Sequence, residues 1–218
     1  MDNENITNAA PEPVDPDQHW VRAAQGGDLD AFEQLVARYE QSTLTLAMRI
    51  VQNTQDAEEA VQETFLSIVE HIRDFKEAST FHTWLVRIAT NHALRILRKR
   101  RTHPTVPLHL DTGEDERPLP HPDFIAQWRD DPQQIAQQHE TRALLTDAIM
   151  QLEEKYRLVF LLRDVEDLST NQTAETLGIT VANTKVRLLR ARLMLREQLT
   201  RVFGDEATRM VPNHEHDE

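Results

Sequence analysis

The stretch from Leu168 to Leu199 constrains the fold more than any other part of the chain. Ser169 is followed three residues later by Gln172, which is the capping-box signature that begins a helix. Gly178 stands where that helix must stop, because glycine tolerates the left-handed conformation that commonly ends helices. Thr180 can then cap a second helix. The stretch therefore predicts a helix, a tight turn and a second helix.

The second of these helices carries two stripes. Residues spaced by three and four predict a face toward a core: Val181, Thr184, Leu188, Ala191 and Leu195. Five cations and no acid lie between Glu175 and Glu197: Lys185, Arg187, Arg190, Arg192 and Arg196. Asn183, Arg187 and Arg190 share another stripe, which we expect to be accessible to phosphates and base edges. This pattern is typical of a helix-turn-helix DNA reader, although a surface helix that happens to be basic would show it too.

The net charge of −13 is unusual for a DNA-binding protein, but its distribution accounts for it. Residues 1–20, 102–141 and 205–218 carry net charges of −5, −6 and −4, which leaves +2 for the rest of the chain. The acidity therefore lies in tails and a linker, while the cations are concentrated on two helices. Because the acidic surplus repels phosphates, we expect the protein alone to bind DNA weakly.

The chain contains only 5 Gly, and most of it has helical periodicity, so we predict an all-α fold. Two small helical domains would be joined by an extended acidic linker, and the second domain would contain the helix-turn-helix. The predicted segments are a disordered acidic tail at 1–19, a first domain at 20–101, a linker with six prolines at 102–135, a second domain at 136–204 and a polar tail at 205–218.

Several classes of protein are disfavoured by what the sequence lacks. There is no cysteine, which removes disulfides and thiolate sites and suits a reducing compartment. Neither a signal peptide nor a membrane-spanning run is present, so we expect a cytoplasmic protein without membrane insertion. No Gly-rich phosphate loop, nucleophile motif or metal-ligand spacing occurs, so we expect no enzyme activity, no cofactor and no metal site.

Two helices predicted for the first domain have opposite charge. The helix that begins at Asn53 or Thr54 has an acidic face, which is either solvated surface or a docking face for a basic or polar partner. The helix predicted over 80–102 has six cations and no acid between Arg87 and Arg101. A second basic helix therefore lies in a different part of the chain from the helix-turn-helix.

This organisation resembles the bacterial extracytoplasmic-function (ECF) sigma factors of the sigma-70 family, which keep only regions 2 and 4. The segment DAEEAVQETFLSIVEHI resembles region 2.2, and DFKEASTFHTWLVRIATNHALRILRKRR resembles regions 2.3 and 2.4. The segment LEEKYRLVFLLRDVEDLSTNQTAETLGITVANTKVRLLRARLMLREQL resembles region 4. The resemblance covers nearly everything from Trp20 to Phe203. Ala182 and Thr184 depart from it, since relatives often have glycine and valine there.

The resemblance implies a protein that binds core RNA polymerase and directs it to promoter DNA. Region 2.2 would dock on the clamp helices of the largest polymerase subunit through Asp56, Glu59, Gln62, Glu63 and Leu66. Regions 2.3 and 2.4 would read the −10 element, where a base is unstacked into a pocket, through Phe75, Lys76, Arg87, Asn91, Arg95, Arg98 and Lys99. Region 4 would contact the polymerase flap and read the −35 element through Thr180, Asn183, Lys185, Arg187 and Arg190.

Two further expectations follow from the resemblance. The linker would thread through the polymerase toward the RNA exit path, and an anti-sigma factor is a candidate regulator.

The alternative function is that of a self-sufficient helix-turn-helix regulator that binds an operator. The second basic helix and the acidic docking face count against that alternative, because a simple repressor needs neither.

Overall fold

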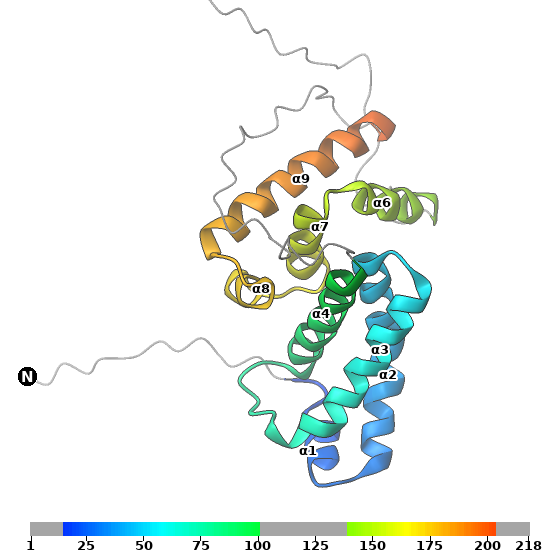
Figure 1. Ribbon diagram of the computed structural model, residues 1–218, viewed down its shortest axis with the longest axis vertical. Coiled ribbons are helices and arrows are strands. Elements are labelled where there is room, and N and C mark those ends of the chain that lie inside the picture. The colour runs from blue at the N-terminus through cyan, green and yellow to red at the C-terminus, as the bar shows by residue number, and fades with distance from the viewer. Residues whose placement is uncertain (1–14, 101–138, 204–218) are drawn as a thin grey trace, which may run out of the picture. The chain divides into compact units, whose positions relative to one another are not determined.

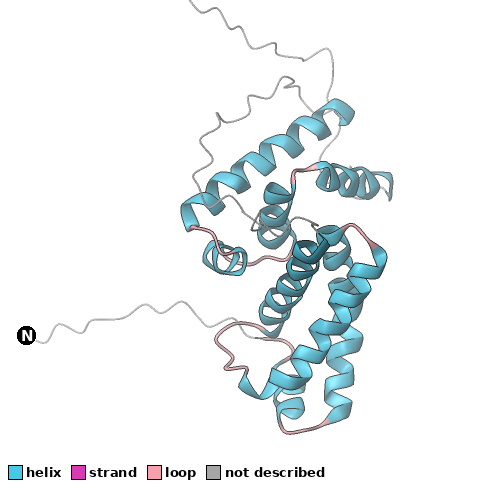
Figure 2. Ribbon diagram, in the orientation of Figure 1, coloured by secondary structure: helices cyan, strands magenta, loops and turns pink. Residues whose placement is uncertain are grey.

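The computed structural model describes residues 15–100 and 139–203, and all regular structure in these two ranges is helical (Figures 1 and 2). This confirms the predicted all-α fold. The described residues up to Met48, with Asn53–Ala93, form one compact unit, and Arg49–Gln52 with the residues from Leu94 onward form a second. The predicted linker at 102–135 and most of both tails lie outside the described residues. Within these residues, no helix has the length and apolar character that a membrane span requires.

Helices α1 (Gln18–Gln25), α2 (Leu29–Val51), α3 (Thr54–His71) and α4 (Phe81–Arg100) build the first half of the chain, and a single 3-10 turn, η1 (Ile72–Asp74), follows α3. Gly27, at φ +94°, allows the sharp turn from α1 into α2. Asn53 caps α3, because its side chain accepts a hydrogen bond of 3.1 Å from the Asp56 backbone N–H. The predicted helices and their start signals are therefore present.

The chain before α1 is anchored to the helices, which corrects the prediction of a disordered tail at 1–19 for residues 15–19. The Asp15 carboxylate accepts a hydrogen bond from the Phe81 backbone N–H, so it caps the start of α4. Asp17 is fully buried, accepts a hydrogen bond from the Tyr39 hydroxyl and lies 3.2 Å from Arg38 Nε. Burial first, and then the bond to Asp17, raise the pKa of Tyr39. The acidic composition that suggested disorder here supplies a helix cap and a buried acceptor.

Helices α6 (His139–Gln151), α7 (Glu154–Phe160), α8 (Thr170–Leu177) and α9 (Val181–Phe203) build the second half, with a π-helical turn, η2 (Leu161–Val165), after α7. Helices α6, α7 and α8 all pack on α9. The core of this half includes Leu158, Leu161 and Leu162, which are fully buried. Each fully buried leucine contributes about 1.5–3 kcal/mol to folding.

A buried arginine joins α6 to α7. Arg157 Nη1 donates hydrogen bonds to the backbone carbonyls of Met150 at 3.3 Å and Leu152 at 2.9 Å. These carbonyls end α6, where the helix leaves acceptors without intrahelical donors. Burial lowers the pKa of Arg157, but the two carbonyls that accept from Nη1 replace part of the hydration that the guanidinium loses.

Candidate nucleic-acid interface

The loop formed by Phe75–Thr80 joins η1 to α4 and contains two predicted DNA contacts. Phe75 is buried, and its ring centroid lies 5.0 Å from that of Trp84 and 6.2 Å from that of Phe81. The ring therefore anchors the loop in an aromatic cluster and cannot contact a DNA strand in this conformation. The Lys76 side chain is exposed. Of the two predicted loop contacts, only Lys76 is positioned to meet a ligand from solvent.

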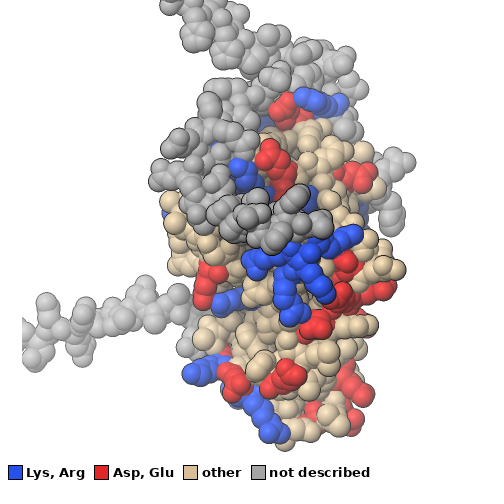
Figure 3. All heavy atoms as spheres, in the orientation of Figure 1, with Lys and Arg blue, Asp and Glu red and all other residues tan. Residues whose placement is uncertain are grey.

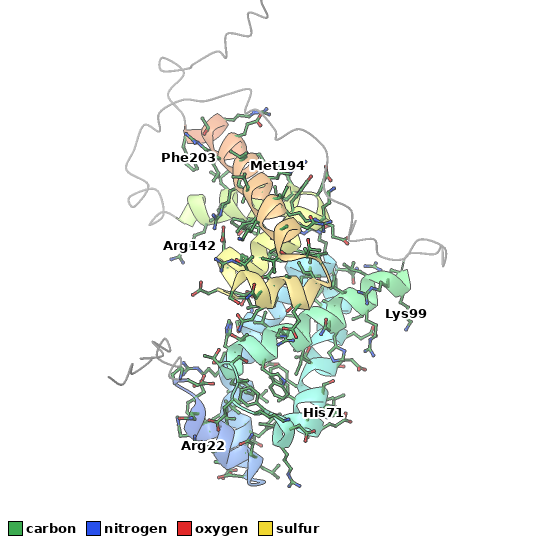
Figure 4. All side chains as sticks on the ribbon, turned by 90° about the vertical axis from the view of Figure 1, so that its left-hand side faces the viewer. Arg22, His71, Lys99, Arg142, Met194 and Phe203 are labelled. Carbon is green, nitrogen blue, oxygen red and sulfur yellow. The ribbon has the colours of Figure 1, made fainter. Side chains whose placement is uncertain are left out.

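Helix α4 presents cations along one side. Asn91, Arg95, Arg98 and Lys99 are exposed, and Arg87 is half-buried. Positions 87, 91, 95 and 98 are separated by three or four residues, so they share one helix face. The helix has no acid, and Arg98, Lys99 and Arg100 occupy its last turn, where the helix dipole favours cations. Lysines and arginines gather over this end of α4, and Lys99 projects from it (Figures 3 and 4).

Helix α3 has an apolar buried face and a polar outer face. Ala57, Ala60 and Ile68 are among its buried residues. The predicted docking residues lie on the rest of the helix: Glu59, Gln62 and Leu66 are exposed, while Asp56 and Glu63 are partly exposed. Leu66 is 59% exposed although it is a large apolar side chain. A partner that covered Leu66 would remove its side chain from water, which is favourable, so this face is a candidate docking surface.

The turn between α8 and α9 has the geometry that the sequence predicted. The Ser169 N–H donates to Gln172 Oε1 at 2.8 Å, and the Gln172 N–H donates to Ser169 Oγ at 3.2 Å, which completes the capping box. Gly178 ends α8 in the left-handed conformation at φ +66°. Thr180 Oγ1 accepts a hydrogen bond of 3.1 Å from the Asn183 N–H and so caps α9. These capping bonds and the glycine together fix the turn between the two helices.

The inner stripe of α9 is largely as predicted. Thr184, Leu188, Ala191 and Leu195 are buried, whereas Val181 is 39% exposed and is a wrong assignment. The Thr184 hydroxyl donates to the Thr180 backbone carbonyl at 3.0 Å, so its burial leaves no unsatisfied donor.

The second stripe of α9 is not accessible, which corrects an expectation. Asn183, Arg187 and Arg190 are only 4%, 0% and 3% exposed, respectively. Each of the three takes part in an interaction within the chain. Thr180 and Lys185 are the members of the predicted −35 set that are exposed. Four of the five lie on α9 and Thr180 caps it, but the sequence could not show what lies against that stripe.

Two family models match the chain. The model of sigma-70 region 2 matches residues 35–103, and the model of sigma-70 region 4 matches residues 142–195. The chain is 31% identical over 176 residues to the RNA polymerase sigma-H factor of Pseudomonas aeruginosa, covering 81% of this chain and 90% of that protein. It is 31% identical over 179 residues to the ECF RNA polymerase sigma factor SigW of Bacillus subtilis, covering 82% and 94%, respectively.

The chain belongs to the ECF sigma factors of the sigma-70 family. As a sigma factor, it binds core RNA polymerase and directs transcription initiation at specific promoters. The alternative hypothesis of a self-sufficient operator-binding regulator is therefore not supported. Its fold is similar to that of the sigma factor RpoE of Bartonella quintana, solved in complex with the anti-sigma factor NepR. That likeness has a TM-score of 0.54, with 21% identity over 78% of this chain and 96% of that one.

Two structural features of this sigma factor were missed from the sequence. In region 4, Asp164 accepts hydrogen bonds from Arg192 Nε at 2.8 Å and Nη2 at 2.7 Å, which ties η2 to α9 and raises the pKa of Arg192. In region 2, Val69 is 54% exposed and extends the outer face of α3 beyond Leu66. Val69 could have been found, because it lies three residues after Leu66. The ion pair could not, since its partners are far apart in sequence.

Proposed function

We propose that this sigma factor docks on core RNA polymerase through the outer face of α3. The observation that carries the proposal is the difference in charge between two helices: α3 presents acids around the exposed Leu66, and α4 presents cations without any acid. A face with acids around an apolar centre suits a partner that is basic at its rim. The clamp helices of the largest polymerase subunit are the partner that the family resemblance implies.

We further propose that the loop Phe75–Thr80 and α4 read the −10 element. Lys76 and Asn91 would contact the exposed strand, while Arg87, Arg95, Arg98 and Lys99 would hold phosphates. The burial of Phe75 supports a structural role for that residue, because its ring packs against Trp84 and holds the start of the loop in place. A contact between Phe75 and a base would require the ring to leave the aromatic cluster.

Helix α9 is proposed to read the −35 element in the major groove. Thr180 and Lys185 are exposed at its start, where recognition helices approach base edges. Asn183, Arg187 and Arg190 would join them only in a conformation that uncovers their stripe. The sigma factor alone should therefore bind a −35 duplex weakly, in agreement with its overall acidity.

Other partners of this chain are proposals as well. The structural neighbour from Bartonella quintana is a complex with an anti-sigma factor, which supports an anti-sigma factor as a regulator of this chain. The polymerase flap, contacted through region 4, and the RNA exit path, approached by the linker, are implied by the family resemblance.

Transcription by core polymerase carrying this sigma factor tests the assignments. Templates would have an intact promoter, an altered −10 element or an altered −35 element. Lys185→Ala should lower transcription from the intact promoter and reduce its dependence on the −35 element, whereas Asn91→Ala should do the same for the −10 element. One lost base contact corresponds to about 1–3 kcal/mol of discrimination. Arg142→Ala, at an exposed cation on α6, is the control and should change neither. Unchanged dependence on both elements in Lys185→Ala and Asn91→Ala would refute the assignments.

A further inference from the structure

Helix α1 contacts the loop Phe75–Thr80 through three polar residues on one face. Gln18, Arg22 and Gln25 are separated by four and three residues, so they point to the same side of the helix. Gln25 Nε2 donates to the backbone carbonyls of Ile72 at 3.0 Å and Phe75 at 2.9 Å. These bonds fix the point where the chain leaves η1 and enters the loop.

The other two residues of α1 hold a single carboxylate. Arg22 donates to Glu77 Oε1 through Nε at 3.1 Å and to Oε2 through Nη2 at 3.1 Å. Gln18 Nε2 donates to Glu77 Oε2 at 2.7 Å. Glu77 thus accepts a two-pronged arginine contact together with an amide hydrogen bond, and this geometry specifies orientation better than a single contact does.

Glu77 needs such support because of its backbone. Its φ is +54°, in the left-handed region that residues other than glycine rarely adopt. A residue held in that region persists only when its surroundings determine its conformation. The Phe75 ring in the aromatic cluster fixes one end of the loop, and the α1 contacts fix its middle. The exposed Lys76 lies between these two attachment points.

The contact also sets the charge of the loop. Glu77 is an acid next to Lys76, in a segment that we propose to approach DNA, and an uncompensated carboxylate there would repel phosphates. The hydrogen bonds from Arg22 and Gln18 lower the pKa of Glu77, which keeps it ionised and paired, and Glu77 raises the pKa of Arg22. With Glu77 neutralised by Arg22, the charge that the loop offers to DNA is that of Lys76.

We propose that α1 is a positioning element for promoter recognition: Gln18, Arg22 and Gln25 set the conformation and charge of the loop Phe75–Thr80 and so sharpen the base preference at the −10 element. This inference rests on the proposed reading of the −10 element by the loop. None of the three α1 residues is assigned a contact with DNA. They act through Glu77 and the loop backbone.

The test is a promoter library, randomised at the −10 element or at the −35 element, transcribed by core polymerase carrying each variant, with the transcripts sequenced. Arg22→Glu should weaken the base preference at the −10 element about two- to fivefold, the range that an exposed charge pair supplies. The preference at −35 should not change. The reciprocal exchange Arg22→Glu with Glu77→Arg restores the opposite charges and should recover much of the preference. Arg73→Glu makes the same charge change at an exposed position of the neighbouring η1 and should have no effect on base preference.

Further outcomes separate this inference from the proposed function. If Lys76→Ala weakens the −10 preference but Arg22→Glu does not, the positioning role of α1 is wrong and the −10 assignment of the loop stands. If neither variant changes the preference, both are wrong. Equal effects of Arg22→Glu and Arg73→Glu, or a loss of total output without a change in preference, would also overturn the positioning role. Hydrogen exchange gives a second measurement: amides of residues 76–80 should exchange about two- to fivefold faster in Gln18→Ala and Arg22→Ala, and unchanged exchange would contradict the proposal.

Discussion

Truncation of Leu66 gives a direct measure of the docking face. Leu66 is 59% exposed on α3, so an interface there can remove that fraction of its surface from water. Complete burial of a leucine contributes about 1.5–3 kcal/mol, and 59% of that is about 0.9–1.8 kcal/mol. Leu66→Ala should therefore raise the Kd for core polymerase about five- to twentyfold. Because the side chain contributes little to the core, the thermal unfolding of the variant should stay close to that of the original protein.

Leu29→Ala is the matched control for this experiment. Leu29 is the same residue type, lies at the start of α2 and is 76% exposed, but it is not on the outer face of α3. Titration of labelled sigma factor with core polymerase would give both Kd values. We expect Leu29→Ala to remain within twofold of the original protein. A Kd for Leu66→Ala that is also within twofold, or an equal loss in both variants, would refute the assignment of docking to α3.

Three other predictions concern the framework that supports these surfaces. At Gly178 the φ is +66° and an added Cβ meets no atom within 4 Å, so Gly178→Ala should cost only backbone conformational energy. The free energy of opening measured by hydrogen exchange in α8 and α9 should fall by about 1 kcal/mol. An unchanged exchange rate would contradict this. The bidentate pair of Asp164 and Arg192 should show a coupling of about 0.5–1 kcal/mol in a double-mutant cycle of urea unfolding, whereas zero coupling would show that the pair does not stabilise the fold. The raised pKa of Tyr39 means that the folded protein holds the hydroxyl proton of Tyr39 more tightly than the unfolded chain does, so the resulting stabilisation is complete below about pH 10 and is lost as the pH rises toward the folded pKa. The variant Tyr156→Phe leaves Tyr39 as the one tyrosine of the chain, and its ultraviolet titration should show ionisation well above pH 10. A midpoint near pH 10 would contradict this prediction.

Local chemistry explains what the sequence could predict. The Ser169 capping box, the left-handed Gly178 and the Thr180 cap each depend on residues within four positions of one another, so their signals can be read directly from the chain. The Asn53 cap of α3 is of the same kind. Helix periodicity likewise identified the inner stripe of α9 at Thr184 and beyond, because a buried face repeats every three or four residues.

Contacts between distant segments explain what it could not predict. Asn183, Arg187 and Arg190 form a regular stripe, but periodicity does not show whether solvent or protein lies opposite it. The bonds from α1 to Glu77 join residues 55 and 59 positions apart, and neither composition nor spacing indicates such a pairing. The family resemblance implied a ligand contact at Phe75, whereas in the tertiary structure its ring packs in an aromatic cluster.

The hydrogen bond between Asp15 and the start of α4 can form only late in the synthesis of this part of the chain. The two bonded residues are 66 positions apart. At a translation rate of about 5–20 residues per second, Phe81 is made about 3–13 seconds after Asp15. Helix α3 precedes Phe81 in the chain, so the proposed polymerase-docking helix leaves the ribosome before Asp15 can bond to the start of α4. A nascent chain would therefore complete the proposed polymerase-docking face first. The contacts that hold the proposed promoter-reading loop could form only after α1 and the start of α4 have both been released.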